Sequence, residues 1–329
     1  MIYIICQDWK STSGNHAGMM HLYKVIHQMH PDETRLYVIK HVRPKLILLW
    51  EYLIAILLIF KLKKGDKVLF TECLIADIDE VQIAKLIKYF RSGIAFYGMV
   101  HLIPEIIEEK IEPQSLSKRL SSLNGIITLG SSLSSYLCKH GIKPSKVHTL
   151  FHYADTEYYK PSKERKDNIS VVVMGALGRD YSSLAQIVKS VPNLHFNICR
   201  GRKNVDDLFV GCNNVTLYGF LSEDELKAIM NKSSISLNVM KDTIGSNVIC
   251  TSIAMGLAMV VSDVGSIRDY CSEDNAIFCK SIQDFINALQ TLSRDEKNIK
   301  SMGLVSASKA ANLAIPHYWN LLKSVLNGK

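Results

Sequence analysis

Short apolar runs that resemble strands alternate along the chain with amphipathic, helix-like segments, and this alternation limits the folds open to it. In the first half, strand-like runs at residues 2–6 (IYIIC), 35–40 (RLYVIK) and 94–100 (IAFYGMV) are accompanied by helical patterns at 17–29 and 80–90. Strands that alternate with helices pair in parallel, because each helical crossover returns the chain to the same edge of the sheet. The pattern predicts a doubly wound α/β domain.

A second series of the same kind begins after the polar segment at residues 160–168 (KPSKERKDN), with a strand-like run at 169–175 (ISVVVMG). A charge run that contains proline is typical of a linker. We therefore predict two Rossmann-like doubly wound domains facing a central cleft, residues 1–160 and 161–315. The amphipathic C-terminal helix, about residues 316–329, is expected to pack back on the first domain.

Composition fits two ordinary globular domains. The 329 residues are 47% hydrophobic and 21% charged, which allows two cores and argues against disorder. The eight cysteines contain no C-x-x-C pair, so neither a zinc ribbon nor a disulfide framework is indicated, and a reducing cytoplasm fits best. The first residues lack the features of a secretory leader.

The net charge of +8 favours anionic partners: nucleotide phosphates, a lipid-linked pyrophosphate, an anionic membrane surface or nucleic acid.

The most apolar stretch, residues 46–60 (LILLWEYLIAILLIF), is interrupted by Glu51. It is shorter than the roughly 20 residues that a spanning helix needs, so we expect it not to cross a membrane. Basic residues flank it at 41–45 (HVRPK) and 61–67 (KLKKGDK). This pattern favours a buried helix whose ends are solvated, and peripheral association with an anionic membrane is the alternative.

Several segments occur in the order found in a known family. Residues 147–161 (VHTLFHYADTEYYKP) are similar to its interdomain segment, and residues 214–239 and 254–270 (AMGLAMVVSDVGSIRDY) follow in its order. The chain thus resembles the GT-B glycosyltransferases of family four, also called group one. The resemblance implies a nucleotide-sugar donor in the C-terminal domain, an acceptor in the N-terminal domain, transfer in the cleft and retention of anomeric configuration.

The turn after residues 169–173 has the composition of a phosphate-binding turn. Gly175 and Arg179 lie in the sequence MGALGR, directly after an apolar run. A strand-to-helix turn presents unpaired backbone N–H groups and a positive dipole to an anion, and the arginine adds a fixed cation. We predict that both residues bind the donor. A packing turn with a solvated arginine is the alternative.

A second turn, DTIGSN, opens the helix-like segment at residues 247–256. Ser246 or Asn247 can cap this helix, which leaves backbone donors aimed at an anion, and Gly245 allows a tight turn before it. These three residues are predicted donor-binding residues. Capping of a core helix explains the same pattern.

Two glutamates of the family are replaced here. In the resemblance, Thr243 and Thr251 stand where the family has a glutamate near the donor sugar and another on the nucleotide ribose. We predict Thr251 as a ribose contact and assign Asp242 and Thr243 to the catalytic side of the site, with Asp242 as a substitute for the missing acid. Fold is therefore predicted more firmly than mechanism.

Further candidates come from other turns. Gly219 and Phe220 end a strand-like run, where the family's backbone groups meet the base, although an apolar strand end has the same pattern. His101 follows residues 94–100 and is predicted to face the sugar, because an imidazole at a strand end can orient a hydroxyl or exchange a proton near neutral pH. A structural histidine is the alternative.

The loop after the first strand contains Gly14, Asn15 and His16, which we predict to contact the acceptor, although an ordinary turn has the same composition. Asp77 and Asp79 form an Asp-x-Asp pair, but they precede a helical pattern and are explained by solvated acids at a helix start. We therefore predict no metal and no cofactor other than the donor substrate.

No G-x-G-x-x-G follows the first strand, and neither a P-loop nor a serine elbow is present, which argues against a dehydrogenase, kinase or hydrolase. The basic residues are dispersed, so nucleic acid is not expected as a partner.

The sequence predicts a cytoplasmic, metal-independent glycosyltransferase that moves a sugar to a glycan or lipid-linked acceptor in surface polysaccharide or glycoconjugate assembly. A nucleotide-sugar epimerase and a catalytically inactive donor-binding partner subunit remain the alternatives.

Overall fold

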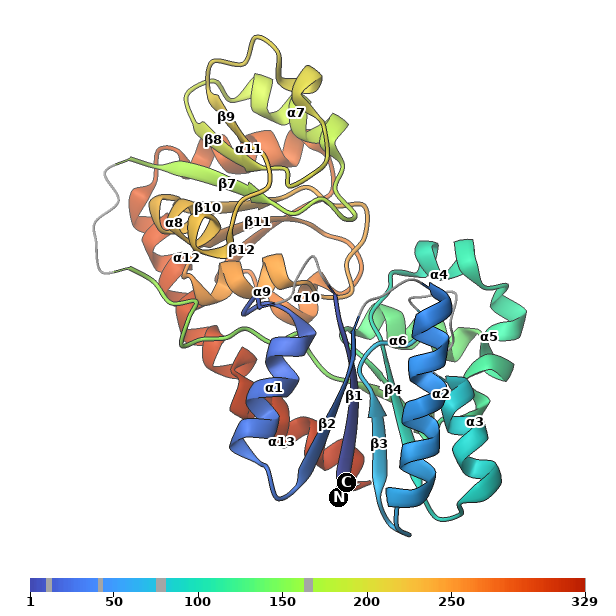
Figure 1. The fold of residues 1–329 in the computed structure, drawn as a ribbon. Coiled ribbons are helices and arrows are strands. Elements are labelled where there is room, and N and C mark those ends of the chain that lie inside the picture. The colour runs from blue at the N-terminus through green and yellow to red at the C-terminus, as the bar shows by residue number, and fades with distance from the viewer. Residues whose placement is uncertain (10–13, 41–43, 75–80, 163–167, 329) are drawn as a thin grey trace. The chain divides into compact units, whose positions relative to one another are not determined.

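The fold was analysed in a computed structural model that describes residues 1–9, 14–40, 44–74, 81–162 and 168–328 (Figure 1). Asp77 and Asp79 lie outside the described residues, as does most of the polar segment at 160–168. The chain forms two compact units. Unit 1 contains residues 1–151 and 315–329, and unit 2 contains residues 152–314.

Unit 1 is built on a six-stranded parallel sheet with the order β2-β1-β3-β4-β5-β6. Its strands are β1 (Ile2–Asp8), β2 (Thr34–Lys40), β3 (Lys67–Phe70), β4 (Ala95–Val100), β5 (Gly125–Thr128) and β6 (Val147–Thr149). Its helices are α1 (Met19–Met29), α2 (Pro44–Lys61), α3 (Val81–Phe90), α4 (Pro104–Lys110), α5 (Pro113–Arg119), α6 (Ser131–Lys139) and α13 (Ile315–Leu326).

Unit 2 contains a second six-stranded parallel sheet with the order β12-β11-β10-β7-β8-β9. Its strands are β7 (Ser170–Met174), β8 (His195–Cys199), β9 (Val215–Tyr218), β10 (Ile235–Asn238), β11 (Ala258–Ser262) and β12 (Ala276–Cys279). Its helices are α7 (Tyr181–Ser190), α8 (Glu223–Lys232), α9 (Asn247–Ala254), α10 (Ile267–Tyr270), α11 (Ile282–Leu292) and α12 (Glu296–Lys309).

In both units the strand order reverses beside the first strand. After β7 the chain builds β8 and β9 on one side and then returns to build β10 to β12 on the other. The central strands β1, β7 and β10 are buried over almost their whole length, because helices cover both faces of such a sheet. Ligands of open α/β sheets bind where the order reverses, beyond the carboxyl ends of the strands. In unit 2 this point lies between β7 and β10.

The C-terminal helix α13 belongs to unit 1, in the position that the sequence predicts. The hydroxyl groups of Tyr23 and Tyr318 are 3.0 Å apart, and the ring of Trp319 stacks on His30 with centroids 5.2 Å apart. Tyr318 and Trp319 are almost fully buried. Large aromatic side chains therefore hold this helix against α1 in the interior of unit 1.

The units divide between Phe151 and His152, earlier in the chain than the predicted boundary at residue 160. The backbone N–H of His152 donates to the Tyr270 hydroxyl at 2.7 Å, and that of Ala154 donates to the Leu313 carbonyl at 2.9 Å. These bonds attach the segment after Phe151 to unit 2. Local composition does not reveal them, because both acceptors are distant in sequence. None of the helices in the described ranges is long and apolar enough to cross a membrane.

Candidate functional site

The turn after β7 lies at the point in unit 2 where the strand order reverses. Gly175 and Gly178 both have positive φ, +81° and +65°, which glycine adopts with little strain. The Tyr181 hydroxyl donates to the Gly175 carbonyl at 2.9 Å, which ties the turn to the first residue of α7. A Cβ at Gly175 would lie 3.1 Å from a methyl group of Val248 in α9. The turn therefore packs closely against the start of α9.

Backbone hydrogen bonds join this turn to the turn after β10. The Lys241 N–H donates to the Gly178 carbonyl at 2.9 Å, and the Asp180 N–H donates to the Val239 carbonyl at 3.1 Å. Arg179 forms an antiparallel bridge with Met240. The turn after β7 and the turn after β10, which the sequence predicts separately, thus form one structure at the carboxyl edge of the sheet. We refer to them together as the joined turns.

Arg179 lies at the junction of these two turns. Its side chain is only 6% exposed, and its Nη2 donates to the Asn238 Oδ1 at 2.8 Å. Its Nη1 is buried and has no hydrogen-bond partner among the described residues, and no carboxylate in the described ranges forms a salt bridge with it. Burial lowers the pKa of the guanidinium to about 10. A buried cation without a counter-ion is a site for an anion.

Helix α9 begins beside Arg179. Ser246 caps the helix, its Oγ accepting the Ile249 N–H at 3.3 Å. The Asn247 Oδ1 is buried without a partner among the described residues. Because the cap occupies one N–H of the first turn, the remaining donors and the dipole stay available to an anion. Gly245, with φ of +92°, makes the bend before the cap, and its N–H donates to the Thr243 hydroxyl at 3.2 Å.

The three residues assigned to the family's missing glutamates are engaged in local bonds. The Thr251 hydroxyl donates to the Asn247 carbonyl of its own helix at 2.7 Å, so it retains only acceptor capacity for a ribose hydroxyl. Thr243 is 3% exposed, and the Asp242 Oδ1 accepts the Thr243 N–H at 2.7 Å. Their predicted roles stay predictions.

The loop after β11 contacts the turn after β10. A Cβ at Gly265 would lie 2.1 Å from the Thr243 carbonyl oxygen, and the Ser266 N–H donates to that oxygen at 2.7 Å. Only glycine fits here, because a side chain would displace the backbone of Asp242 and Thr243. Sequence inspection did not identify this contact, which depends on two loops from different strands.

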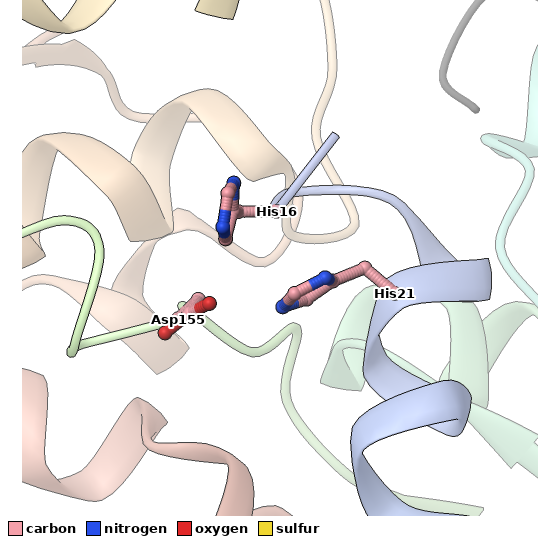
Figure 2. Close-up of side chains that lie close together, drawn as sticks. All are labelled: His16, His21 and Asp155. Atoms are coloured by element: carbon pink, nitrogen blue, oxygen red, sulfur yellow. The ribbon is translucent and has the colours of Figure 1, made fainter. Parts of the chain in front are cut away.

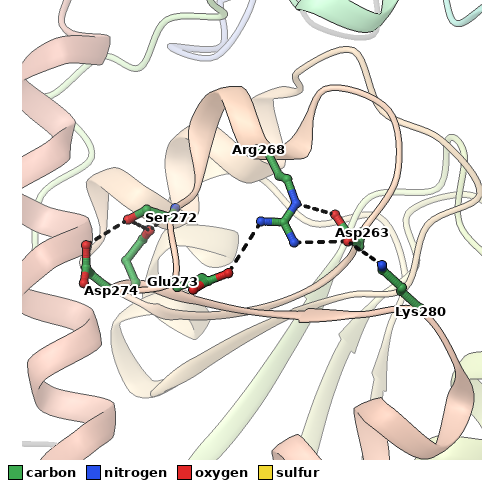
Figure 3. Close-up of polar contacts among 7 residues, drawn as sticks. Asp263, Arg268, Ser272, Glu273, Asp274 and Lys280 are labelled. Carbon is green, nitrogen blue, oxygen red and sulfur yellow. Dashed lines mark hydrogen bonds and ion pairs between the residues drawn. The ribbon is translucent and has the colours of Figure 1, made fainter.

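Figure 3 shows an ion-pair network at the same edge. Arg268 donates from Nε and Nη2 to the two carboxylate oxygens of Asp263, at 2.8 and 3.1 Å. Lys280 lies 3.8 Å from Asp263, and Glu273 lies 3.7 Å from Arg268. The hydrogen bond from Arg268 lowers the pKa of the Asp263 carboxyl. These charges neutralise one another, whereas the Arg179 guanidinium has no charged partner in the part of the chain that the structure describes.

The sequence of this unit matches a described family. Residues 169–295 match the family described as glycosyl transferases group 1. This match covers one domain, which is most of unit 2 and less than half of the chain. The predicted enzyme class, a glycosyltransferase, is confirmed at the level of this domain, which contains both turns. None of the curated proteins compared with the chain matches its sequence.

Solved structures share the fold over the whole chain. A glycosyltransferase from Rickettsia africae is 11% identical with a TM-score of 0.74, over 99% of this chain and 97% of that one. Anabaena Alr3699/HepE, solved with UDP, is 10% identical with a TM-score of 0.74, and sucrose-phosphate synthase from Thermosynechococcus elongatus is 10% identical with a TM-score of 0.75. The last two similarities cover 100% of both chains. The predicted GT-B fold is confirmed.

Two predicted residues of the group 1 domain lie away from the joined turns. Gly219 and Phe220 follow β9, the edge strand, which β8 separates from β7. Phe220 is 62% exposed, and the guanidinium of Arg202 lies 4.9 Å from its ring centroid. An exposed aromatic ring with a cation above it can stack on a planar base. No described contact connects this pair to Arg179.

The remaining predicted residues belong to unit 1. His101 follows β4 at the carboxyl edge of that sheet and is half-buried. Gly14 has φ of +83° and is exposed, and the Asn15 carbonyl accepts the Gly18 N–H at 3.1 Å, just before α1. Figure 2 shows the ring of His16 beside that of His21 of α1, with centroids 4.6 Å apart.

Asp155, also drawn in Figure 2, belongs to unit 2. Its Oδ1 accepts the N–H groups of Glu157 and Tyr158 at 3.1 and 3.3 Å. The carboxylate thereby closes a local turn in the segment between Phe151 and the predicted linker.

Sequence analysis did not identify Glu72, which follows β3 and is 5% exposed. The Trp9 indole N–H donates to its carboxylate. Burial raises the pKa of the Glu72 carboxyl to about 7, and the hydrogen bond from Trp9 opposes part of this rise. A carboxyl that titrates near neutrality, at a strand end close to the point where the order of this sheet reverses, is a candidate acid or base. The sequence signal was a glutamate directly after an apolar strand.

Unit 2 also contains a cavity of about 1070 Å³, which does not include the two turns described above. Its lining includes His195 and Ser234 at strand starts, Gly256 after α9, and Arg294 and Lys300 near α12. These positions are at the amino ends of the strands, opposite the joined turns. We place the candidate site at the carboxyl edge, because the buried guanidinium and the reversal of strand order coincide there.

Proposed function

We propose that this protein transfers a sugar from a nucleoside-diphosphate sugar to a glycan or lipid-linked acceptor, with unit 2 binding the donor. The observation that supports this most directly is the buried Arg179, whose guanidinium has one neutral partner and a free Nη1 at the joined turns. A pyrophosphate would supply the missing negative charge and hydrogen-bond acceptors.

The surroundings of Arg179 suit a diphosphate better than a single carboxylate. The capped start of α9 offers backbone donors, and Asn247 at the same end of the helix carries an amide NH2 group that can donate to a phosphate. Glycines at 175, 178 and 245 keep side chains off the turns. A ligand with two linked anionic groups can contact both turns at once, while one carboxylate reaches only one of them.

Structural neighbours support the same class of ligand. Anabaena HepE has been solved with UDP, with UDP and glucose, and with UDP-glucose. A lipopolysaccharide outer core galactosyltransferase, WaaB, has a TM-score of 0.71 at 11% identity. By analogy we propose a donor of the nucleotide-sugar class and an acceptor in surface polysaccharide or glycoconjugate assembly.

In the proposed reaction an acceptor hydroxyl oxygen bonds to the anomeric carbon, the bond from that carbon to the phosphate oxygen breaks, and the hydroxyl proton is released to solvent. The nucleoside diphosphate leaves with the extra negative charge, which Arg179 and the start of α9 would stabilise. We propose that these groups take the part that a metal ion plays in other transferases. Retention of configuration follows from the resemblance only, and the anomeric configuration of the product tests it.

Two other functions keep the same donor site. A nucleotide-sugar epimerase would convert the donor in the absence of any acceptor. The threonines at 243 and 251 favour a second alternative, a donor-binding partner subunit without activity, because threonine hydroxyls cannot replace two carboxylates. Incubation of the purified protein with donor alone, and then with candidate acceptors, separates the three functions.

Thermal stabilisation by UDP, GDP and ADP is the first experiment, since it also identifies the nucleotide. We expect one nucleotide to raise the melting temperature of the wild type, and Arg179→Ala and Asn247→Ala to remove most of this rise. Arg294→Ala, an exposed arginine at the opposite edge of the sheet, is the matched control. An equal rise in all variants, or none with any nucleotide, contradicts the site.

We further propose a cytoplasmic location and an anionic membrane surface as a partner, with nucleic acid excluded. The net charge of +8 supports an anionic partner but does not select one. The membrane partner is developed below from the side chains of unit 1.

A further inference from the structure

Helix α2 exposes an almost continuous apolar face. Seven of its large apolar side chains are between 39% and 77% exposed. They are Leu49, Trp50, Tyr52, Leu53, Ile56, Leu57 and Phe60. Their spacing of three and four residues places them along one side of the helix. Single exposed apolar residues are common on protein surfaces, but a contiguous group of this size marks an interaction site.

The opposite side of α2 is also apolar. Ile54, Ala55 and Leu58 are buried, and so is Glu51, at 3% exposure. A surface helix of a soluble protein normally places its charged residues outward. In the part of α2 whose side chains are described, the one carboxylate points inward and the outward face is apolar. The sequence pattern of a buried helix with solvated ends therefore does not describe this helix.

The end of helix α3 extends this face. Tyr89 and Phe90 are 84% and 58% exposed, and their rings contact each other edge to face with centroids 5.0 Å apart. The Arg91 Nε donates to the Ile59 carbonyl at 2.5 Å, which connects the end of α3 to α2. We refer to the seven side chains of α2 together with Tyr89 and Phe90 as the α2–α3 surface.

Positive charge borders the α2–α3 surface. Lys61, Lys63, Lys64, Lys85 and Arg91 are all exposed. Residues 49–64 and 83–93, all of them described, contain no exposed carboxylate, because their single acid is the buried Glu51. Over these described residues the border of the apolar surface is cationic, which suits a partner that is apolar in its interior and anionic at its boundary.

We propose that the α2–α3 surface docks on an anionic phospholipid membrane, with α2 lying in the plane of the interface. Apolar side chains would enter the boundary between headgroups and acyl chains, while lysines and Arg91 contact lipid phosphates. Trp50, Tyr52 and Tyr89 are residue types enriched at this depth. The 18 residues of α2 extend about 27 Å, long enough to anchor one side of unit 1.

A second copy of the chain fits this surface less well than a membrane does. A symmetric dimer brings the same patch of both copies together, so the lysines of one would approach those of the other. Like charges facing each other oppose such an association. This inference rests on the membrane partner proposed above and deepens it, while docking involves no residue of the donor site and can succeed or fail independently of nucleotide binding.

Vesicle flotation tests the proposal with the full chain. We expect the wild type to float with vesicles of phosphatidylglycerol and phosphatidylcholine in equal parts, and far less with phosphatidylcholine alone. Binding should weaken between ionic strengths of about 0.1 M and about 1 M, where the Debye length falls from about 10 to about 3 Å.

Variants locate the contact. Ile56→Ser and Phe60→Ser should each lower the partition coefficient about tenfold, and Lys63→Ser and Lys64→Ser about fivefold each. Leu304→Ser and Lys297→Ser, at exposed positions of α12 in unit 2, are the matched controls and should bind as the wild type does. Circular dichroism checks that all variants remain folded.

Three outcomes overturn the proposal: no flotation with anionic vesicles, equal loss in the control variants, or binding that is insensitive to Phe60→Ser. A dimer in sedimentation velocity that Phe60→Ser dissociates, without vesicle binding, assigns the surface to a second copy instead. The nucleotide-induced rise in melting temperature is measured on the same variants. Because it should be unchanged in all of them, loss of docking remains distinguishable from loss of the donor site.

Discussion

Replacement of Arg179 by methionine should stabilise the empty protein and abolish its response to nucleotide. The guanidinium is 6% exposed, and burial lowers its pKa from 12.5 to about 10. At 1.36 kcal/mol per pKa unit, this corresponds to roughly 3 kcal/mol against the charged form. Below pH 10 the group is charged in both the folded and the unfolded chain, so the whole cost is present at neutral pH.

Methionine fills a similar volume without a charge. It removes the cost of the buried cation, but leaves the Asn238 Oδ1 without the donor that now lies 2.8 Å away. A buried acceptor that loses its partner costs about 1–3 kcal/mol. The net gain in the free energy of unfolding is then about 0–2 kcal/mol, or up to a few degrees in the melting temperature of unit 2. At the same time the charge-assisted bond to the ligand, about 1.5–3 kcal/mol, is lost.

Urea denaturation and nucleotide titration of Arg179→Met measure both effects. We expect a higher midpoint without ligand and a dissociation constant for nucleotide raised at least tenfold, while Arg294→Met changes neither. A variant that is less stable than the wild type, yet binds nucleotide equally well, would refute the view of Arg179 as an uncompensated cation. In that case the guanidinium has a structural role.

Three further predictions concern other positions. Gly265→Ala should destabilise unit 2 by several kcal/mol and weaken nucleotide binding, because its Cβ would overlap the Thr243 carbonyl, whereas Gly201→Ala, with φ of +63° and open space, should cost about 1 kcal/mol in urea denaturation. Glu72→Gln should gain stability relative to the wild type as the pH rises from about 4.5 to about 7, since over that range the wild-type carboxyl ionises in the unfolded chain but stays protonated in its buried folded site; pH-dependent urea midpoints that stay parallel would contradict this. His101→Ala should lower kcat more than it raises the dissociation constant of the donor, and steady-state kinetics would disprove a catalytic role if only the latter changed.

Periodicity alone predicted most of the fold. The alternation of strand-like and helix-like segments was sufficient for two doubly wound sheets, because the period of apolar residues directly reflects which side chains the sheet and its helices bury. The residue types in the turns located both turns of the candidate site, since glycine, serine and asparagine have specific backbone roles at strand-to-helix turns. These features depend on a few neighbouring residues and are therefore legible in the sequence.

Features that depend on distant partners were not predictable in the same way. The boundary after Phe151 follows from bonds to Tyr270 and Leu313, and the requirement for glycine at 265 follows from contact with Thr243. The sequence does not single out Glu72, because its raised pKa results from burial, and burial depends on segments that are distant in the chain.

The sequence by itself determined the two α/β units and the place of the two glycine-containing turns of the candidate site in the second. Only the tertiary structure decided that Arg179 has no carboxylate partner among the described residues, and that α2 turns its glutamate inward and its aromatic side chains outward. The physical reason is the same in both cases. The charge balance of a buried group and the exposure of a helix face depend on which distant segments pack against them, and local composition does not specify those segments.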